Sequence, residues 1–155
     1  MTSRANDARL IAVLDTNALI RGALTTTWLA RGLRIAWEQG DFILLTSEAI
    51  LDELGRVLRY PRIAGRYALT EAAIREFEDS VRGASVVVPG LYVVRKIEAD
   101  PSDDKFLACA LEGDADFIVS EDPHLRDLKS YQGIPIISMN QFSAKLGLQS
   151  RRSVR

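Results

Sequence analysis

The chain has 155 residues, of which 47% are hydrophobic and 26% charged, and its formal net charge is −1. These values are typical of one globular domain that buries a core without disulfides. They argue against a protein that binds nucleic acid chiefly through a broad basic surface. Nucleic-acid chemistry at an acidic site stays open, because a divalent metal bound there supplies positive charge.

The composition also indicates the compartment. Cys109 is the one cysteine, so no disulfide forms within the chain, and we expect a reducing, cytoplasmic environment. No apolar stretch approaches the ~20 residues of a membrane helix, and the opening MTSRANDARL is too polar for a secretory signal. We expect residues 1–9 to be a disordered N-terminal segment and residues 148–155 a solvated basic tail.

The first half of the chain predicts two buried strands, each followed by helix. Residues 10–14 form a short, fully apolar run, which is typical of a strand buried on both faces. Gly40 and Tyr60-Pro61 mark the ends of two helices. The expected elements are, in order, a strand over 10–14, helices over 18–24 and about 27–39, a strand over 42–45 and a helix from 48 to about 59.

The second half continues this alternation. Residues 85–88 and 91–97 are rich in β-branched side chains but are separated by Pro89-Gly90, so we expect only one of them in the main sheet. The remaining expected elements are helices over about 70–82 and 101–112, a strand over 117–120, a short helix over 123–129, a strand over 134–138 and a helix over 141–146. Short apolar strands alternating with helices indicate one α/β domain, a mostly parallel β-sheet with helices on both faces.

Acidic residues follow the predicted strands, at the edge where parallel sheets gather their functional groups. Asp15 comes directly after the first strand, and Asp122 lies shortly after the strand at 117–119. Glu48 and Glu53 are on the helix after the second strand, with Glu53 about a turn and a half further in. We therefore expect these side chains to approach one another.

A further run, Glu98–Asp104, carries four acids around a predicted helix start. Carboxylates there cap free N–H groups and suit the helix dipole by ~0.3–1 kcal/mol, and we favour this interpretation for Asp100 and Asp103. Capping of the first helix is an equally open interpretation of Asp15. Asp15 nevertheless fits a site better, because Asp is a poor strand residue and here adjoins a wholly apolar run.

Carboxylates that are brought together select a cation. Several within a few ångströms repel one another, and some must protonate unless a cation holds them. Mg²⁺ or Mn²⁺ suits oxygen ligands, whereas a single histidine and the lack of a cysteine pair disfavour zinc. Such an ion activates water and stabilises charge on a phosphodiester. The composition of the site thus points to phosphoryl transfer or hydrolysis.

Four segments in this order resemble the PIN-domain family, and the resemblance extends from about Leu10 to Leu146, within an expected domain of residues 10–147. The segments are Val13–Asn17, Ser47–Leu54 with Arg56-Val57-Leu58, Asp103–Ala110 and Ala115–Asp122. Each is weak alone, and the four together are specific. The runs at 100–105 and 122–125 are similar to a branch of toxin components of bacterial toxin–antitoxin pairs.

The resemblance implies a PIN-like fold and a Mg²⁺- or Mn²⁺-dependent endoribonuclease that hydrolyses single-stranded RNA as the toxin of such a pair. It also implies a small antitoxin protein as partner, and we further expect a homo-oligomer, a dimer. The implied catalytic residues and metal ligands are Asp15, Glu53, Asp104 and Asp122. The implied supporting residues are Asn17, Ser120 and Asp103, and the sequence leaves open whether Asp103 or Asp104 points inward.

Basic residues near the acids are the expected RNA contacts. Lys105 either reaches the scissile phosphate or neutralises the acids beside it. Arg56 begins a series of four arginines spaced by three or four residues, which is either a phosphate-binding face or a solvated surface. The lone His124 is interpreted as structural rather than as a proton shuttle, and Cys109 as a core residue.

Glu121 departs from the family's pattern, which has a small or basic residue before the last acid. Its charge retunes metal affinity or repels substrate, and it favours a rival function, a catalytically weak PIN module that binds RNA or a protein. A second rival is another metal hydrolase, such as a DNA nuclease or a phosphatase. The chain lacks the insertions that shape a DNA arch and a Gly-rich phosphate loop.

Overall fold

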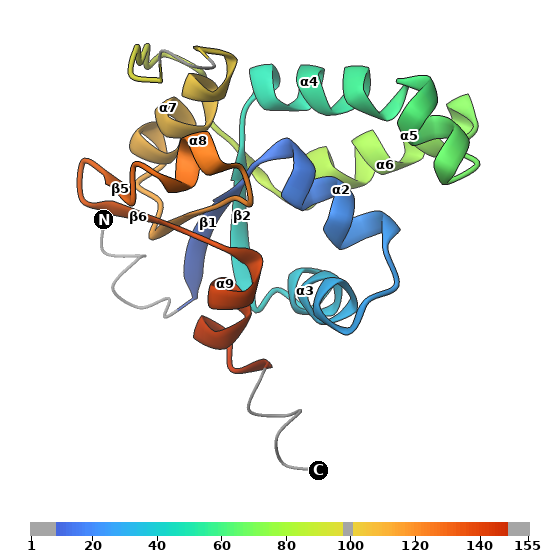
Figure 1. The fold of residues 1–155 in the computed structure, drawn as a ribbon, viewed down its shortest axis with the longest axis horizontal. Coiled ribbons are helices and arrows are strands. Elements are labelled where there is room, and N and C mark those ends of the chain that lie inside the picture. The colour runs from blue at the N-terminus through green and yellow to red at the C-terminus, as the bar shows by residue number, and fades with distance from the viewer. Residues whose placement is uncertain (1–8, 98–100, 149–155) are drawn as a thin grey trace.

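The apolar runs of the sequence form one six-stranded sheet with the order β3-β2-β1-β4-β6-β5 (Figure 1). The computed structural model describes residues 9–97 and 101–148. Its strands are β1 (Leu10–Leu14), β2 (Phe42–Thr46), β3 (Val86–Val87), β4 (Phe117–Val119), β5 (Ser130–Tyr131) and β6 (Ile134–Ile137). All neighbours are parallel except β5, which runs antiparallel to β6 at the edge. The predicted fold class, an α/β domain with a mostly parallel sheet, is confirmed.

Some predicted features lie outside the residues that the structure describes. They are residues 1–8 and 149–155 of the expected terminal segments, and the acids Glu98 and Asp100. Within the described part, no helix combines the length and the apolar composition needed to cross a bilayer.

Helices cover the sheet on both sides. They are α2 (Thr16–Leu24), α3 (Trp28–Glu38), α4 (Glu48–Leu58), α5 (Pro61–Arg66), α6 (Glu71–Gly83), the 3-10 turn η1 (Pro101–Asp103), α7 (Asp104–Glu112), α8 (Pro123–Arg126) and α9 (Met139–Lys145). In Figure 1, α7 lies on one side of β1 and β2, and α2 and α3 lie on the other.

The alternation of side chains along β2 explains this two-sided packing, because successive residues of a strand point to opposite faces. Phe42 and Leu44 line a cavity together with residues of α3 and α6. Leu45 points the other way and approaches Gly113, at the end of α7. Cys109 on α7 is buried, and burial raises the pKa of its thiol to about 12, as expected of a core residue.

Turn chemistry accounts for the elements that the sequence did not predict. Tyr60-Pro61 ends α4 as expected, but Pro61 also begins α5, because proline is well suited to the first position of a helix. β5 and β6 are joined by Gln132-Gly133, both with positive φ (51° and 83°), the conformation of a tight hairpin turn. As expected, only one of the two β-branched segments, at Val86–Val87, pairs in the sheet.

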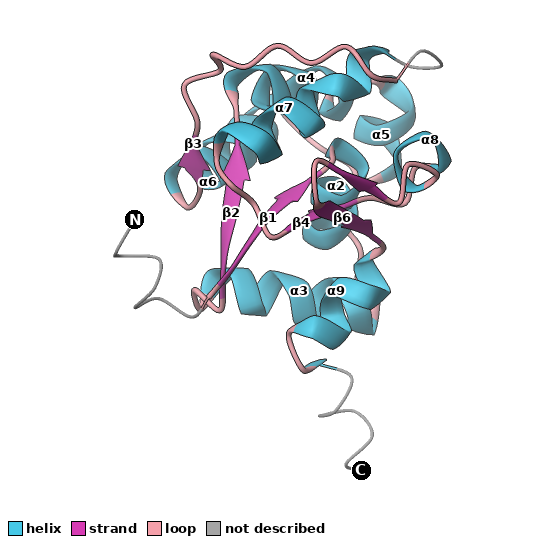
Figure 2. Ribbon diagram, turned by 90° about the vertical axis from the view of Figure 1, so that its left-hand side faces the viewer, coloured by secondary structure: helices cyan, strands magenta, loops and turns pink. Residues whose placement is uncertain are grey.

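Polar side chains begin the helices that follow the strands. Asp15, Ser47, Asp122 and Ser138 are the N-caps of α2, α4, α8 and α9, and each accepts a hydrogen bond from a backbone N–H of its helix. Backbone hydrogen bonds from Asp15 to Val119 and from Ser120 to Ile137 keep the ends of β1, β4 and β6 level. The arrowheads of β1 and β2 in Figure 2 point to this polar edge, where α4 and α7 lie.

Candidate functional site

Asp15 is the most buried carboxylate of the polar edge, with 4% of its surface exposed. Its Oδ1 accepts a hydrogen bond from the Ala18 N–H (2.9 Å), and its Oδ2 accepts one from the Ser120 hydroxyl (2.5 Å). Burial raises the pKa of Asp15 to about 6, and the nearby charges of Asp122 and Glu121 add to the rise. Asp15 is therefore both a helix cap and a buried member of an acidic group.

Ser120 connects Asp15 to the second acid of the edge. Its fully buried hydroxyl donates to Asp15 and accepts a hydrogen bond from the backbone N–H of Asp122 (2.9 Å). Asp122 in turn caps α8 by accepting a hydrogen bond from the His124 N–H (2.8 Å). One hydroxyl thus sets the spacing between the ends of β1 and β4, which is the geometry that a supporting residue requires.

The adjacent acids Asp103 and Asp104 have different surroundings. The carboxylate of Asp104 accepts hydrogen bonds from the backbone N–H groups of Ile97 (2.8 Å) and Lys96 (3.1 Å), so it holds the chain that precedes α7. Asp103 is buried, with 7% of its surface exposed, and occupies the N-cap position of α7 without a side-chain cap hydrogen bond. Asp103 is thus at a helix start, as expected, but its side chain does not cap α7 by a hydrogen bond.

Asp103 lies close to Asp122 and His124. One donor atom from each of Asp103, Asp122 and His124 lies within 4.8 Å of the other two, a spacing that can hold a metal ion. His124 Nδ1 lies 3.8 Å from Asp122 Oδ1, and about half of the His124 side chain is exposed. The sequence did not predict a role for His124 here, although its place two residues after Asp122 at a helix start was a usable signal.

Glu53 reaches the edge from α4 and is already engaged. Its Oε2 accepts a hydrogen bond from the Thr16 hydroxyl (2.5 Å), and its Oε1 pairs with Lys105 Nζ (2.5 Å). The same ammonium donates to the Ser102 carbonyl oxygen. Of the two roles expected for Lys105, the structure shows the neutralisation of an acid. Thr16 is a partner that the sequence did not predict, even though it directly follows Asp15.

Asn17 and Arg56, two of the other expected site residues, have exposed side chains in the first turn of α2 and on α4. Arg59, next in the arginine series, is paired with Glu71 (2.6 Å) and Glu78 (3.2 Å) of α6. At least one of these arginines therefore stabilises helix packing rather than offering a free charge to phosphate.

Glu121 turns toward the start of α9. Its carboxylate accepts a hydrogen bond from the Met139 N–H (2.9 Å) and lies 3.6 Å from the guanidinium of Arg126. These contacts give the residue a structural role and partly neutralise its charge. The presence of Glu121, which favoured a catalytically weak module, is thus also explained by its structural contacts with Met139 and Arg126.

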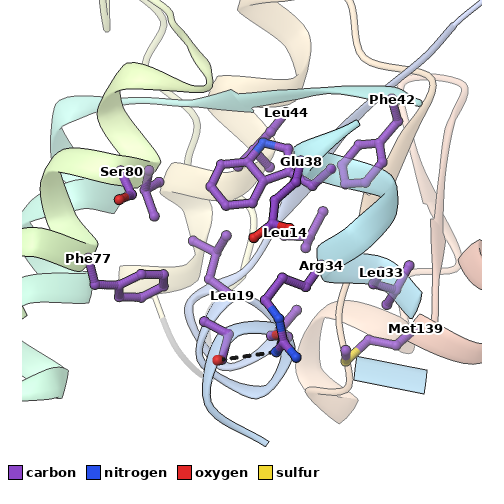
Figure 3. A pocket seen from close by; sticks show the side chains of 15 residues that line it. Leu14, Leu19, Leu33, Arg34, Glu38, Phe42, Leu44, Phe77, Ser80 and Met139 are labelled. Carbon is purple, nitrogen blue, oxygen red and sulfur yellow. Dashed lines mark hydrogen bonds between the residues drawn. The ribbon is translucent and has the colours of Figure 1, made fainter. Parts of the chain in front are cut away.

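A cavity of about 210 Å³ lies elsewhere, between the sheet, α2, α3 and α6 (Figure 3). Its walls are mainly apolar, and Arg34 at its rim donates hydrogen bonds to the carbonyl oxygens of Gly22 (2.8 Å) and Ala23 (3.3 Å). None of the expected acids lines this cavity. The expected acidic site and the cavity are therefore separate features of the structure.

Comparison with known proteins places this geometry in a family. A search of the curated proteins found no match to the chain. A sequence model described as PIN domain matches residues 11–124, a range that includes Asp15, Glu53, Asp103 and Asp122. PIN domains are typically metal-dependent nucleases that act on RNA. Because the match covers most of the chain and all the acids that meet at the edge, the chain belongs to the PIN domain family.

Proposed function

We propose that this chain is a Mg²⁺- or Mn²⁺-dependent endoribonuclease that hydrolyses phosphodiester bonds of single-stranded RNA. One observation carries this proposal: donor atoms of Asp103, Asp122 and His124 lie within 4.8 Å of one another. The family supports it, because PIN domains are typically metal-dependent nucleases.

The residues present fit a divalent ion. Carboxylate oxygens are the ligands that Mg²⁺ and Mn²⁺ prefer, and an imidazole nitrogen suits Mn²⁺ as well. The raised pKa of Asp15, about 6, supports the same conclusion, since a cation at this edge would favour the ionised carboxylate. We propose Asp15, Asp103, Asp122 and His124 as the residues that hold the ion.

When bound, the ion supplies a Lewis acid that activates water and stabilises the charge that develops on the phosphate. The chain positions the ligands. Ser120 orients Asp15 and Asp122 through one hydroxyl, and outer contacts of this kind tune metal affinity. Asp104 holds residues 96 and 97 and so fixes the start of α7, which Asp103 directly precedes. This role differs from that of the ligand implied by the family resemblance.

We also propose that the protein is the toxin of a toxin–antitoxin pair, acts in the cytoplasm and forms a homodimer. The similarity of residues 100–105 and 122–125 to that branch supports this role. An exposed apolar segment also supports a protein partner, because Leu91 and Val93 are 77% and 78% exposed. Co-purification with the product of a neighbouring short reading frame, and its inhibition of cleavage, would test the pairing.

The catalytic proposal is tested with purified protein and three substrates: single-stranded RNA, single-stranded DNA and a phosphomonoester. We expect cleavage of RNA alone, in Mg²⁺ or Mn²⁺ and not in EDTA. Asp103→Asn should abolish cleavage, whereas Asp41→Asn, at an exposed turn, should leave it unchanged. RNA binding without cleavage in either metal would identify a non-catalytic module, and cleavage of DNA would identify a different nuclease.

A further inference from the structure

The acids of the polar edge divide into two groups with different partners. Asp103 and Asp122 lie with His124 in the group that can hold an ion. Glu53 is not a member of this group, and each of its carboxylate oxygens already accepts a hydrogen bond, one from Thr16 and one from the ammonium of Lys105. Glu53, the second group, is therefore already paired with a cation of the chain itself, the ammonium of Lys105.

Lys105 is held in this position and is not a loosely placed surface side chain. Its side chain and that of Glu53 are each 16% exposed. The ammonium has a second hydrogen-bond partner, the carbonyl oxygen of Ser102, and it lies 5.2 Å from the centre of the Phe106 ring. Ser102 directly precedes Asp103, so one ammonium joins α4 to the turn that carries a proposed metal ligand.

This placement has an electrostatic consequence. An ammonium in contact with Glu53 neutralises that carboxylate, and it repels any divalent ion that approaches Glu53. Partial burial strengthens this repulsion, because the surrounding dielectric constant is lower than that of water. A divalent ion would have to displace Lys105 from both Glu53 and Ser102 before Glu53 could bind it.

We propose that the ammonium of Lys105 is a built-in cation of this site. It takes the place beside Glu53 that a second divalent ion would otherwise occupy, so the protein binds one metal ion per chain at this edge. This inference rests on the proposed metal-dependent nuclease function and specifies how many ions that function uses.

Mn²⁺ titration of the full-length, metal-free protein tests the inference. Isothermal titration calorimetry counts the ions, and electron paramagnetic resonance separates a single Mn²⁺ from a spin-coupled pair. We expect one ion in the wild type, a second ion with a coupled-pair signal in Lys105→Met, and one ion in the control Lys145→Met, whose lysine is exposed on α9. Methionine retains the length of the lysine side chain and removes its charge.

Two results would overturn the inference: two ions in the wild type, or one ion in both the wild type and a folded Lys105→Met. If Lys105→Met does not fold, Glu53→Gln decides. With Lys105 as the cation, Glu53 is not a ligand, and Glu53→Gln retains one ion with an affinity within about threefold of the wild type. A loss of tenfold or more, about 1.4 kcal/mol, would show that Glu53 binds the ion directly.

Different results would contradict the proposed nuclease function and the inference about Lys105. If the wild type binds no Mn²⁺ at all, the proposed metal-dependent function fails, and the inference about Lys105 fails with it. If the wild type binds two ions and cleaves RNA, the function stands and Lys105 is not a substitute for a metal ion.

Discussion

Asp15 connects the folding of this chain to its proposed chemistry, because the same carboxylate caps α2 and belongs to the acidic edge. In the metal-free protein its folded-state pKa, about 6, lies above the ordinary value of 3.8. The folded state therefore binds the proton more tightly than the unfolded state does. The resulting stabilisation is complete below the ordinary pKa and is lost as the pH rises through about 6.

Asp15→Asn should reveal this pH dependence in urea denaturation with EDTA present. At pH 8 the variant should be more stable than the wild type by about 1–3 kcal/mol, because the cost of burying a charge is removed. The gain is limited, because Ala18 and Ser120 donate to different oxygens of Asp15, and in asparagine one of these two acceptors is replaced by an NH₂ group, which donates. The difference should shrink or reverse near pH 4, and a less stable variant at pH 8 would contradict the prediction.

Asp103 and Asp104 should respond differently to the loss of their carboxylates. Asp103→Asn is expected to retain the fold and to lower cleavage by about 100-fold or more, because it removes a proposed metal ligand. Asp104→Ala is expected to lower the free energy of unfolding by about 1–3 kcal/mol, because the N–H groups of Lys96 and Ile97 lose their acceptor. Urea denaturation and cleavage rates measured on both variants check the pair, and the opposite pattern would make Asp104 the ligand.

At the scale of elements, the sequence predicts those structural features that depend on residues close together along the chain. The apolar run of β1 and the proline that ends α4 are local signals, and both were confirmed. The orientation of Asp103 could not be predicted, because Asp103 belongs to a 3-10 turn before α7, which the sequence pattern predicts as part of one helix. The pairing of Lys105 with Glu53 joins residues 52 positions apart, and it follows only from the way α4 and α7 pack together.

The packing of α7 against β2 leads to a prediction at Gly113. A Cβ atom at this position would lie 2.4 Å from Leu45 Cδ1 and 3.1 Å from Val88 Cγ1. Gly113→Ala should therefore lower the free energy of unfolding by about 1–3 kcal/mol, because the close-packed core must shift. Gly83→Ala, at the end of α6, is the matched control, since a Cβ atom there meets nothing within 4 Å. Equal stability of the two variants in thermal or urea denaturation would contradict this close contact.

At the scale of the whole molecule, the charge distribution limits how RNA is bound. The net charge is −1, and exposed arginines such as Arg59 and Arg82 are paired with glutamates. A cluster of carboxylates repels phosphate, so metal-free protein has little attraction for RNA at this edge. A bound divalent ion reverses the local charge, and we expect RNA affinity to depend on metal even where no bond is cut.

Fluorescence anisotropy with a cleavage-resistant phosphorothioate RNA measures this dependence. Adding Mn²⁺ to metal-free protein should tighten binding by about tenfold or more, which corresponds to about 1.4 kcal/mol.

The dependence of RNA affinity on salt concentration should be shallow, with a slope magnitude of about 2 or less, because each phosphate neutralised on a single strand contributes about 0.7. Arg56→Ala should reduce that slope by about 0.7 if the exposed guanidinium contacts phosphate. A steep slope in EDTA, with affinity unchanged by Mn²⁺, would instead show that a basic face binds RNA independently of the acidic edge, as expected of a non-catalytic module.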